Sequence, residues 1–307
     1  MQFEGPEKKL EILFSNNSKS LRQNNDLSWQ DILLACGAQI IRKTNFGSFD
    51  AYIVSESSLF VFDHKVTLIT CGQTDLLRAL PLLLKDIGQD QISYLFYCRK
   101  SLSFPEAQVS DFEQEVSSIL SYISGKSYRL GPANEEHIHV FLATSWELEA
   151  LPQDDFTLEL LMIDPDEEVM SHFCYDHNKP LSEDVRHRMG FSNIYEEEDV
   201  KIDDYCFDSC GYSLNGSVNN HYFTLHVTPQ EQSSYVSFET SLREDNTFAR
   251  VQKLLNIFKP SKALLVLYDV SGSSVYNEDS DLWRIEEYTE ILSLGYYMKA
   301  YQLKKKE

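Results

Sequence analysis

The sequence predicts an α/β protein whose two halves follow a similar order of elements. Two strand-like runs, a helical run and a further strand-like run occur twice along the 307 residues, which suggests a duplication with little shared sequence. The hydrophobic fraction of 42%, with 12% aromatic residues, is enough to build a core and excludes a disordered chain. A length of 307 residues corresponds to two domains or to one large domain.

The first half contains β-prone runs and three helical runs. Ser28 is a typical N-cap, Asp31 adds an acid in the first turn, and Gly37 is suited to end that helix. A leucine-rich helix begins near Asp75, and Pro81 either kinks it or marks its true start. The strand-like runs are 39–44, 50–55, 59–63, 66–71 and 92–97, and the third helical run is 110–125.

The second half is predicted to contain further strands and one helix. The strand-like runs are 137–143, 156–162, 221–227, 235–240 and 263–268, and the apolar face of the helix covers 248–258. Between the halves, residues 176–208 are polar and acidic and are predicted to form a surface loop.

The chain is strongly acidic. It carries 27 Lys and Arg residues against 48 Asp and Glu residues, a formal net charge of −21. Phosphate recognition needs clustered cations, and an anionic membrane would repel this charge, so we expect neither nucleic acid nor membrane as a partner. A cationic ligand would be attracted, although solubility alone also explains the charge.

The sequence is typical of a cytoplasmic protein. No apolar run approaches the ~20 residues that cross a bilayer, and the first residues lack a basic and apolar leader. Six cysteines are too few and too irregular for a disulfide scaffold, so we expect reduced thiols.

One cysteine and histidine pattern approximates a zinc finger. Cys206, Cys210, His221 and His226 form C-x3-C-x10-H-x4-H. The gap between the Cys and His pairs is short, the internal apolar residues of a finger are missing, and a strand is predicted where a finger has its helix. We therefore favour no metal here and keep a zinc-binding interaction module as an alternative.

A short polar segment, Ser55-Glu56-Ser57-Ser58, separates two strand-like runs. In an arbitrary protein it would be an ordinary hairpin turn. Together with several other segments, however, it resembles one family, eukaryotic S-adenosylmethionine decarboxylase. The sequence of these segments is closest to that of fungal members. The segments that carry the resemblance are 3–8, 57–65, 70–72, 96–100, 210–216, 225–229 and 234–240.

The resemblance implies a four-layer α/β/β/α sandwich, with two antiparallel sheets face to face and helices outside. Residues 1–307 would form a single domain of two pseudo-repeat halves, both contributing to the active site. The implied activity is that of a lyase that decarboxylates S-adenosylmethionine to the aminopropyl donor of spermidine and spermine biosynthesis. The proenzyme would cleave itself into a β chain, 1–56, and an α chain, 57–307.

A decarboxylase must hold the electron pair left on the α-carbon, and a carbonyl cofactor does so through a Schiff base. The resemblance implies that this pyruvoyl group is made from Ser57, whose hydroxyl attacks the Glu56 carbonyl to form an ester. Loss of the Ser57 α-proton then expels the Glu56 carboxylate. Ser213 and His226 match the processing pair. Cys71 matches the residue that returns a proton after decarboxylation, which requires a protonated thiol.

The resemblance also assigns substrate contacts. Phe3 and Phe207 match two aromatic residues that stack on the adenine, and such stacks contribute about 1–3 kcal/mol per face. Glu56, freed as a new C-terminus, would contact the substrate. Glu4 and Glu7 match acidic residues that the family needs for activity.

Two departures from the family pattern matter. The ribose-binding glutamate of the family is Gln230 here, so we expect weaker ribose binding, because an amide has one acceptor oxygen and no charge. The lysine that links an activator site to the active site is Ile69 here, and a neighbouring serine is Cys98. We therefore expect putrescine to bind but to activate less. The residues that match the putrescine site are Glu11, Asp155, Thr157, Glu159 and Glu239.

The main alternative function is that of a catalytically weak paralogue, a regulatory subunit of a true decarboxylase. Gln230 and Ile69 keep this alternative open, but such paralogues typically lose the processing serine, and this chain keeps Ser57. The family includes monomers and dimers, so a monomer, a homodimer and a heterodimer with a paralogue all remain open.

Overall fold

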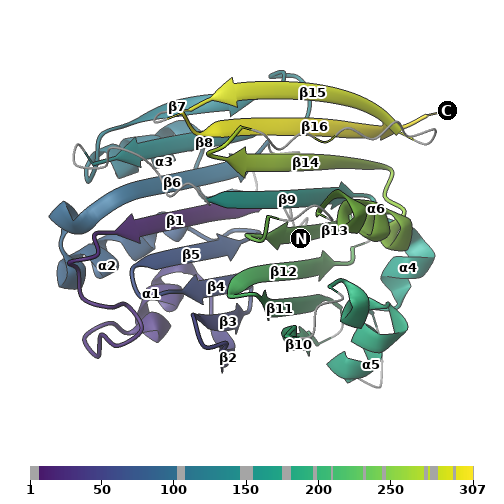
Figure 1. Cartoon of the computed structure of the whole chain (residues 1–307), viewed down its shortest axis with the longest axis horizontal. Coiled ribbons are helices and arrows are strands. Elements are labelled where there is room, and N and C mark those ends of the chain that lie inside the picture. The colour runs from purple at the N-terminus through teal and green to yellow at the C-terminus, as the bar shows by residue number, and fades with distance from the viewer. Residues whose placement is uncertain are drawn as a thin grey trace. The chain divides into compact units, whose positions relative to one another are not determined.

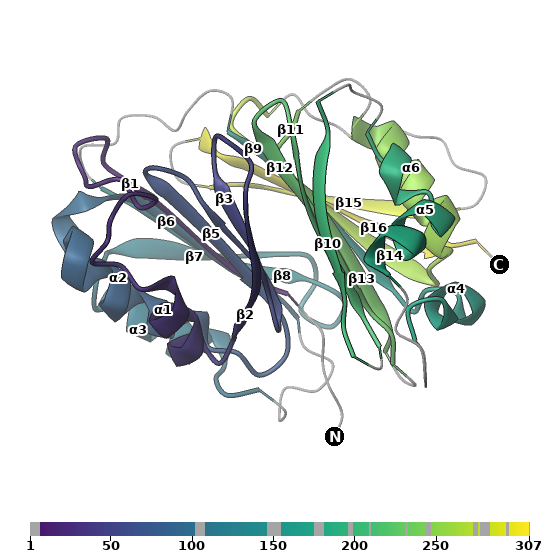
Figure 2. The ribbon, with the colours of Figure 1, turned by 90° about the horizontal axis from the view of Figure 1, so that it is seen from below.

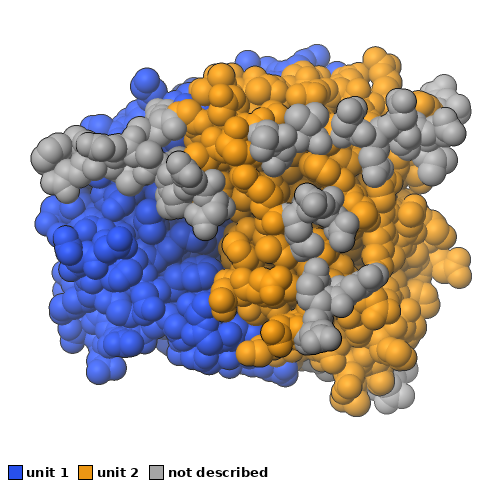
Figure 3. Space-filling view, in the orientation of Figure 1, with its two compact units in different colours: residues 1–151, 292–294 blue, residues 152–291, 295–307 orange. Residues whose placement is uncertain are grey.

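The structure is a computed structural model that describes residues 7–101, 108–145, 155–174, 181–195, 199–208, 210–230, 233–243, 247–272, 276, 283–292 and 295–306. The chain divides into two compact units, residues 1–151 with 292–294 and residues 152–291 with 295–307 (Figure 3). Each unit is built around one eight-stranded sheet.

The sheet of the first unit has the order β2-β3-β4-β5-β1-β6-β8-β7, and its neighbouring strands are antiparallel (Figure 1). The first strand of the chain therefore lies in the interior of the sheet. The strands are β1 Lys8–Phe14, β2 Ile40–Asn45, β3 Asp50–Val54, β4 Ser57–Val61, β5 Lys65–Thr70, β6 Ile92–Lys100, β7 Gly125–Leu130 and β8 Ile138–Thr144.

Helices lie along one face of this first sheet (Figure 2). Leu10, Ile12 and Leu68 on the strands share a buried core with Leu33 and Leu80 on the helices. The helices are α1 Trp29–Cys36, α2 Ala79–Ile87 and α3 Phe112–Leu120, with 3-10 turns at Leu76–Arg78 and Gln89–Gln91.

The predicted ends of α1 are confirmed. The Ser28 side chain accepts a hydrogen bond from the Asp31 backbone N–H, and Gly37 ends the helix in the left-handed conformation at φ 87°. The third predicted helix is shorter than expected, because it ends at Leu120 and Gly125 already opens β7.

The sheet of the second unit has the order β10-β11-β12-β13-β9-β14-β16-β15, which repeats the order of the first sheet strand for strand. Its strands are β9 Phe156–Ile163, β10 Lys201–Cys206, β11 Tyr212–Val218, β12 His221–Thr228, β13 Tyr235–Thr240, β14 Lys262–Asp269, β15 Trp283–Ile291 and β16 Tyr297–Lys305. The helices are α4 Glu167–Ser171, α5 Ser182–Arg188 and α6 Thr247–Phe258, with a 3-10 turn at Phe191–Asn193.

The surface loop predicted for residues 176–208 is wrong over much of its length. The described part contains α5, a 3-10 turn and β10. Val185 and Phe191 are fully buried, and the Phe191 ring packs 5.8 Å from that of Phe258. Acidic residues in the first turn of α5 and basic residues in its last turn interact favourably with the helix dipole. The charged residues of this segment are therefore compatible with a helix.

The first strand, β1, is not predicted from the sequence pattern, and its buried charges are the reason. Lys8, Lys9 and Glu11 interrupt its apolar alternation, yet all three are buried. Buried charges require partners, and these partners lie in the neighbouring strands and turns described below.

The prediction that the cysteines are reduced is wrong for one pair. Cys174 and Cys210 form a disulfide, and the two residues also make a β-bridge that places their backbones side by side. The other four cysteines are free. In the described residues, no helix is both long and apolar enough to span a membrane.

Alkylation tests the disulfide. Labelling the denatured protein without reductant should modify the four cysteines Cys36, Cys71, Cys98 and Cys206, and prior reduction should raise the count to six. A Cys174→Ser variant frees Cys210 and serves as the control. Six labelled cysteines without reductant would contradict the disulfide.

Candidate active site

The predicted cleavage bond lies in the tight connection between β3 and β4. Val54 pairs with Ser57 across this hairpin, so Ser55 and Glu56 form its turn. On its other side, Ser57 pairs with Thr70, the last residue of β5. The Glu56–Ser57 bond is therefore fixed by two paired strands rather than carried by a free loop.

The Glu56 carbonyl oxygen faces two donors from one residue. It accepts from the backbone N–H of Cys71 at 3.1 Å and from the Cys71 Sγ at 3.3 Å. Donors at a carbonyl oxygen stabilise the negative charge that develops when the carbonyl carbon is attacked. The residue after β5 is thus placed to polarise the carbonyl of the predicted cleavage bond.

Ser57 itself is strained and unsatisfied. Its φ is 150°, whereas the other described non-glycine residues with positive φ lie between 46° and 66°. Such a conformation costs about 1–3 kcal/mol in a residue with a side chain. Its Oγ is buried and has no hydrogen-bond partner within the described residues, and an orphaned buried hydroxyl is also costly. Both features favour a reaction that consumes this serine.

The surroundings of Cys71 keep its thiol protonated. Burial raises the pKa of the Cys71 thiol, and the nearby Glu56 and Glu7 carboxylates raise that pKa further. Burial likewise raises the pKa of the Glu56 carboxyl group. A protonated thiol at neutral pH is what a proton donor requires.

Ser213 and His226 are cross-strand partners in β11 and β12, and the Ser213 Oγ lies 2.9 Å from the His226 Nδ1. On the other side of the ring, the Thr224 Oγ1 lies 2.8 Å from Nε2. The Thr224 hydroxyl donates its single proton to the Leu214 carbonyl or the Asn215 side-chain oxygen, both at 3.0 Å. In that arrangement Thr224 can only accept from the ring, which assigns the ring proton to Nε2 and leaves Nδ1 as the basic atom, whereas a Thr224 hydroxyl that donates to Nε2 gives the opposite tautomer.

The His226 imidazole is neutral at physiological pH. Burial lowers the pKa of His226 to about 3, because the charged ring would lose its hydration. Sequence reasoning identified Ser213 and His226 but missed Thr224. The available signal was the spacing of Thr224 from His226, because residues that are two positions apart in a strand lie on the same face.

The predicted substrate residues are only partly described. Phe207 follows β10, and its half-buried ring meets that of Tyr205 edge-on at 5.2 Å. Gln230 follows β12 and exchanges hydrogen bonds of 2.9 and 2.8 Å between its backbone and the Ser234 hydroxyl. Phe3 and Glu4 lie outside the described residues.

The zinc alternative does not fit the structure. Cys210 is bonded to Cys174, and the His226 ring contacts Ser213 and Thr224 with its two nitrogens. Nowhere in the described part of the chain are three or more His, Cys, Asp or Glu residues grouped to hold a metal ion.

Glu11 in the first unit is already compensated by cations of this chain. Its carboxylate contacts the Lys65 ammonium at 3.3 Å, accepts from Thr67 at 2.8 Å and accepts from the Tyr94 hydroxyl. Burial alone would raise the pKa of Glu11, but the charges of Lys65 and Lys9, together with the hydrogen bonds from Tyr94 and Thr67, lower it to about 2.

Lys9 occupies an informative place in the sheet. It pairs with Ile69 on one side and with Cys98 on the other, so these two departures from the family pattern flank a buried lysine on the same face of the sheet. A cation missing at position 69 is therefore present one strand away. Sequence reasoning missed this because the strand pairing was unknown.

Two acidic residues of the second unit lie side by side. Glu159 and Glu239 are direct cross-strand partners in β9 and β13, and both are buried. Directly opposed like charges are destabilising unless a proton or a cation compensates them. Thr157 lies two residues before Glu159 in β9, and Asp155 immediately precedes that strand.

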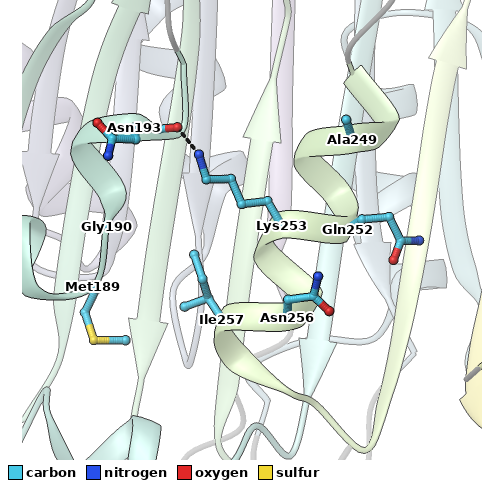
Figure 4. Close-up of a pocket in the computed structure, with 8 residues that line it drawn as sticks. All are labelled: Met189, Gly190, Asn193, Ala249, Gln252, Lys253, Asn256 and Ile257. Carbon is cyan, nitrogen blue, oxygen red and sulfur yellow. Dashed lines mark hydrogen bonds between the residues drawn. The ribbon is translucent and has the colours of Figure 1, made fainter.

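A hollow of about 640 Å³ lies elsewhere in the second unit, between the α5 end and α6 (Figure 4). The Lys253 ammonium reaches across it to the backbone carbonyl of Asn193. None of the predicted site residues lines this hollow.

Known proteins are similar to this chain in sequence. A family model described as adenosylmethionine decarboxylase matches residues 1–306. An S-adenosylmethionine decarboxylase proenzyme of Drosophila melanogaster is 35% identical over 302 residues, 91% of this chain and 86% of that protein. One of Dictyostelium discoideum is 33% identical over 290 residues, 88% of this chain and 76% of that protein.

Similarity also extends to a solved structure. The crystal structure of the Trypanosoma brucei AdoMetDC-delta26 monomer matches with a TM-score of 0.63 at 21% sequence identity. The match covers 81% of this chain and 99% of that chain. At this identity the match shows the fold alone, and the predicted fold class is confirmed.

The state of His226 predicts how stability depends on pH. Its pKa is lowered from the ordinary histidine value of 6.5 to about 3, so below pH 6.5 the unfolded chain binds a proton that the native chain does not. The free energy of unfolding should therefore fall as the pH drops from 6.5 toward 3, by at most about 1.4 kcal/mol per pH unit. Urea unfolding of a Ser57→Ala chain should show this slope, and His226→Gln should reduce it.

The exposed His187 of α5 provides the matched control, and His187→Gln should leave the slope unchanged. An identical slope with and without the His226 imidazole would show that this ring titrates alike in both states.

Proposed function

Because this chain belongs to the adenosylmethionine decarboxylase family, we propose that it cleaves itself at Ser57 and decarboxylates S-adenosylmethionine with the resulting pyruvoyl group. The product is the aminopropyl donor of spermidine and spermine biosynthesis. The observation that carries the proposal is a strained Ser57 backbone, whose hydroxyl has no hydrogen-bond partner among the described residues, beside a carbonyl that already accepts two hydrogen bonds.

Cleavage begins with the chain's own atoms. The Ser57 Oγ attacks the Glu56 carbonyl carbon, the C–N bond between the two residues breaks, and the nitrogen takes up the hydroxyl proton. An ester replaces the peptide bond. Negative charge passes through the Glu56 oxygen during this step, where the Cys71 N–H and thiol lie 3.1 and 3.3 Å away. The strain at Ser57 is released when its amide bond is lost.

A base then removes the Ser57 α-proton, and the Glu56 carboxylate leaves. Elimination followed by addition of water releases ammonia and leaves a carbonyl at residue 57. His226 suits the role of base, because its ring is neutral and one of its two nitrogens is therefore unprotonated. The Ser213 Oγ lies 2.9 Å from the His226 Nδ1, and the family resemblance assigns Ser213 to oxyanion stabilisation.

The pyruvoyl group, when formed, would supply an electrophilic carbonyl that can hold the electron pair left on the substrate α-carbon when carbon dioxide departs. Among the described residues the Ser57 Oγ has no hydrogen-bond partner that would compete with its attack on the Glu56 carbonyl, the step from which the group is made. Cys71 holds a proton at Sγ through neutral pH, where it is available for return to the substrate α-carbon. The Glu7 charge, by raising the Cys71 pKa, helps to keep that proton in place.

Substrate binding follows the same family assignment. Phe207 presents a half-buried ring for adenine stacking, and Phe3 supplies the second ring. Gln230 binds the ribose with an amide in place of a carboxylate, so ribose affinity is weaker than in the family pattern. Glu4 and the freed Glu56 carboxylate complete the acidic surroundings of a cationic sulfonium substrate.

The mass of the denatured protein tests self-processing. We expect two fragments, 1–56 and 57–307, and an intact chain for Ser57→Ala. Ser213→Ala and His226→Ala should leave the chain intact or stalled as the ester. Ser55→Ala serves as the control and should cleave normally. It removes another hydroxyl of the same turn, one that accepts a hydrogen bond from the distant Gln39 N–H. A wild-type chain that stays intact after long incubation would instead favour the regulatory-subunit function.

We further propose that putrescine activates this protein weakly. The resemblance places Glu11 in the activator site, and Lys65 and Lys9 already offset the charge of that carboxylate. A dication gains less from a carboxylate that an internal cation has neutralised. The opposed Glu159 and Glu239 still provide anionic partners, which is why binding is retained.

A decarboxylation assay titrated with putrescine tests this coupling. Stimulation should stay below about tenfold, and Lys9→Leu should increase the response because it removes one competing cation. The double variant Lys9→Leu/Ile69→Lys returns a cation to the family position one strand away. Wild-type stimulation of about tenfold or more would contradict weak coupling.

A further inference from the structure

Lys8 is a buried lysine that the reaction outlined above does not use. Only 2% of its surface is exposed. Its ammonium donates to the Gly72 carbonyl at 3.0 Å and to the Thr74 carbonyl at 2.7 Å. Charge-assisted hydrogen bonds of this kind are roughly twice as strong as neutral ones. Lys8 thus ties β1 to the turn that follows β5.

The turn held by Lys8 is the one that contains Cys71. Residues 71–74 leave β5 through Gly72, which has a positive φ of 67°. The Thr74 hydroxyl donates to the Cys71 carbonyl at 3.1 Å and lies 2.6 Å from the Thr70 hydroxyl. These contacts close the turn on itself, and the two Lys8 contacts connect it to the sheet.

Lys8 contacts residues that precede and follow Cys71 in the sequence. In the sheet Lys8 pairs with Thr70, and Thr70 pairs in turn with Ser57. Beyond Cys71, the Lys8 ammonium binds Gly72 and Thr74. The Cys71 N–H and thiol that meet the Glu56 carbonyl therefore belong to a residue that is flanked on one side by the strand pairing of Lys8 and on the other by contacts of its side chain.

The charge of Lys8 also acts on the thiol. It lowers the pKa of Cys71 and thus opposes Glu56 and Glu7, although burial keeps the net direction upward. Burial first, and then the neighbouring Arg99, lowers the pKa of Lys8 to about 8. Below that pH the ammonium is charged and can donate to both carbonyls at once.

We propose that Lys8 is a positioning residue for self-processing, which holds the 71–74 turn so that Cys71 presents its amide and thiol to the Glu56 carbonyl. This inference rests on the proposed cleavage at Glu56–Ser57. A donor that shifts by about 1 Å can cost roughly 100-fold in rate, so loss of the two Lys8 contacts should be visible in the cleavage rate.

The test compares Lys8→Met, Lys8→Arg and Lys100→Met in the full-length chain. Methionine keeps the approximate length of the side chain but removes the charge and the donors, whereas arginine keeps both. Lys100 is the matched control, because it is another buried lysine of the same sheet, and its ammonium binds Glu136. Cleavage is followed by mass after cell-free synthesis.

We expect Lys8→Met to slow cleavage by about 10- to 100-fold, Lys8→Arg to recover most of the rate, and Lys100→Met to cleave as wild type does. Thermal melting of each variant in a Ser57→Ala chain measures the folded fraction independently. A Lys8→Met chain that is folded and cleaves at the wild-type rate, or that is slowed no more than Lys100→Met, would overturn the inference.

A second readout does not depend on cleavage. In Ser57→Ala chains, the alkylation rate of Cys71 at about pH 7, where Lys8 is charged, should fall when Lys8 becomes Met, because loss of the cation raises the thiol pKa further. An unchanged rate would argue against the positioning role. If the wild-type chain fails to cleave, the proposed function fails and the processing role of Lys8 fails with it, whereas a wild-type chain that cleaves while Lys8→Met matches it overturns the inference alone.

Discussion

The central constraint in this protein is the geometry of one peptide bond. Glu56 lies in a hairpin turn, and its carbonyl accepts from both the amide and the thiol of Cys71. The next residue, Ser57, is strained, and its hydroxyl has no partner in the part of the chain that the structure describes. Hydrogen bonds that polarise the carbonyl and strain that is released when the adjoining amide is lost both favour cleavage. The first sheet places these groups, because β3, β4 and β5 are consecutive neighbours in it.

Burial sets the protonation state of several candidate residues in each unit. His226 is neutral because burial lowers its pKa, and Cys71 is protonated because burial and two carboxylates raise its pKa. Lys8 and Lys9 are adjacent in β1, and since neighbouring strand residues point to opposite faces, they act on different groups. Lys8 holds the Cys71 turn, and Lys9 contributes to the charge balance of Glu11. The net charge of −21 therefore conceals a small number of cations with specific partners.

Sequence patterns predicted the elements whose signals are local. The cap at Ser28, the left-handed end at Gly37 and the strand that carries His226 could be read from residue types and spacing. Strand β1 could not, because its buried lysines resemble surface residues until their partners are known. The disulfide between Cys174 and Cys210 and the helix inside residues 176–208 likewise depend on contacts between distant segments. For the candidate site, recognition of motifs supplied the residues predicted to react, whereas the contacts of Thr224, Lys8 and Lys9 depend on the register of the strands.

The central claim is that Ser57 becomes a carbonyl through the chemistry of its own chain. Capture with an aminooxy reagent, followed by peptide mapping, tests this claim most directly. We predict that the label is found on residue 57 at the start of the larger fragment, and that Ser57→Ala carries none. A larger fragment that begins with a free amine at residue 57, or an unlabelled intact chain, would contradict the claim.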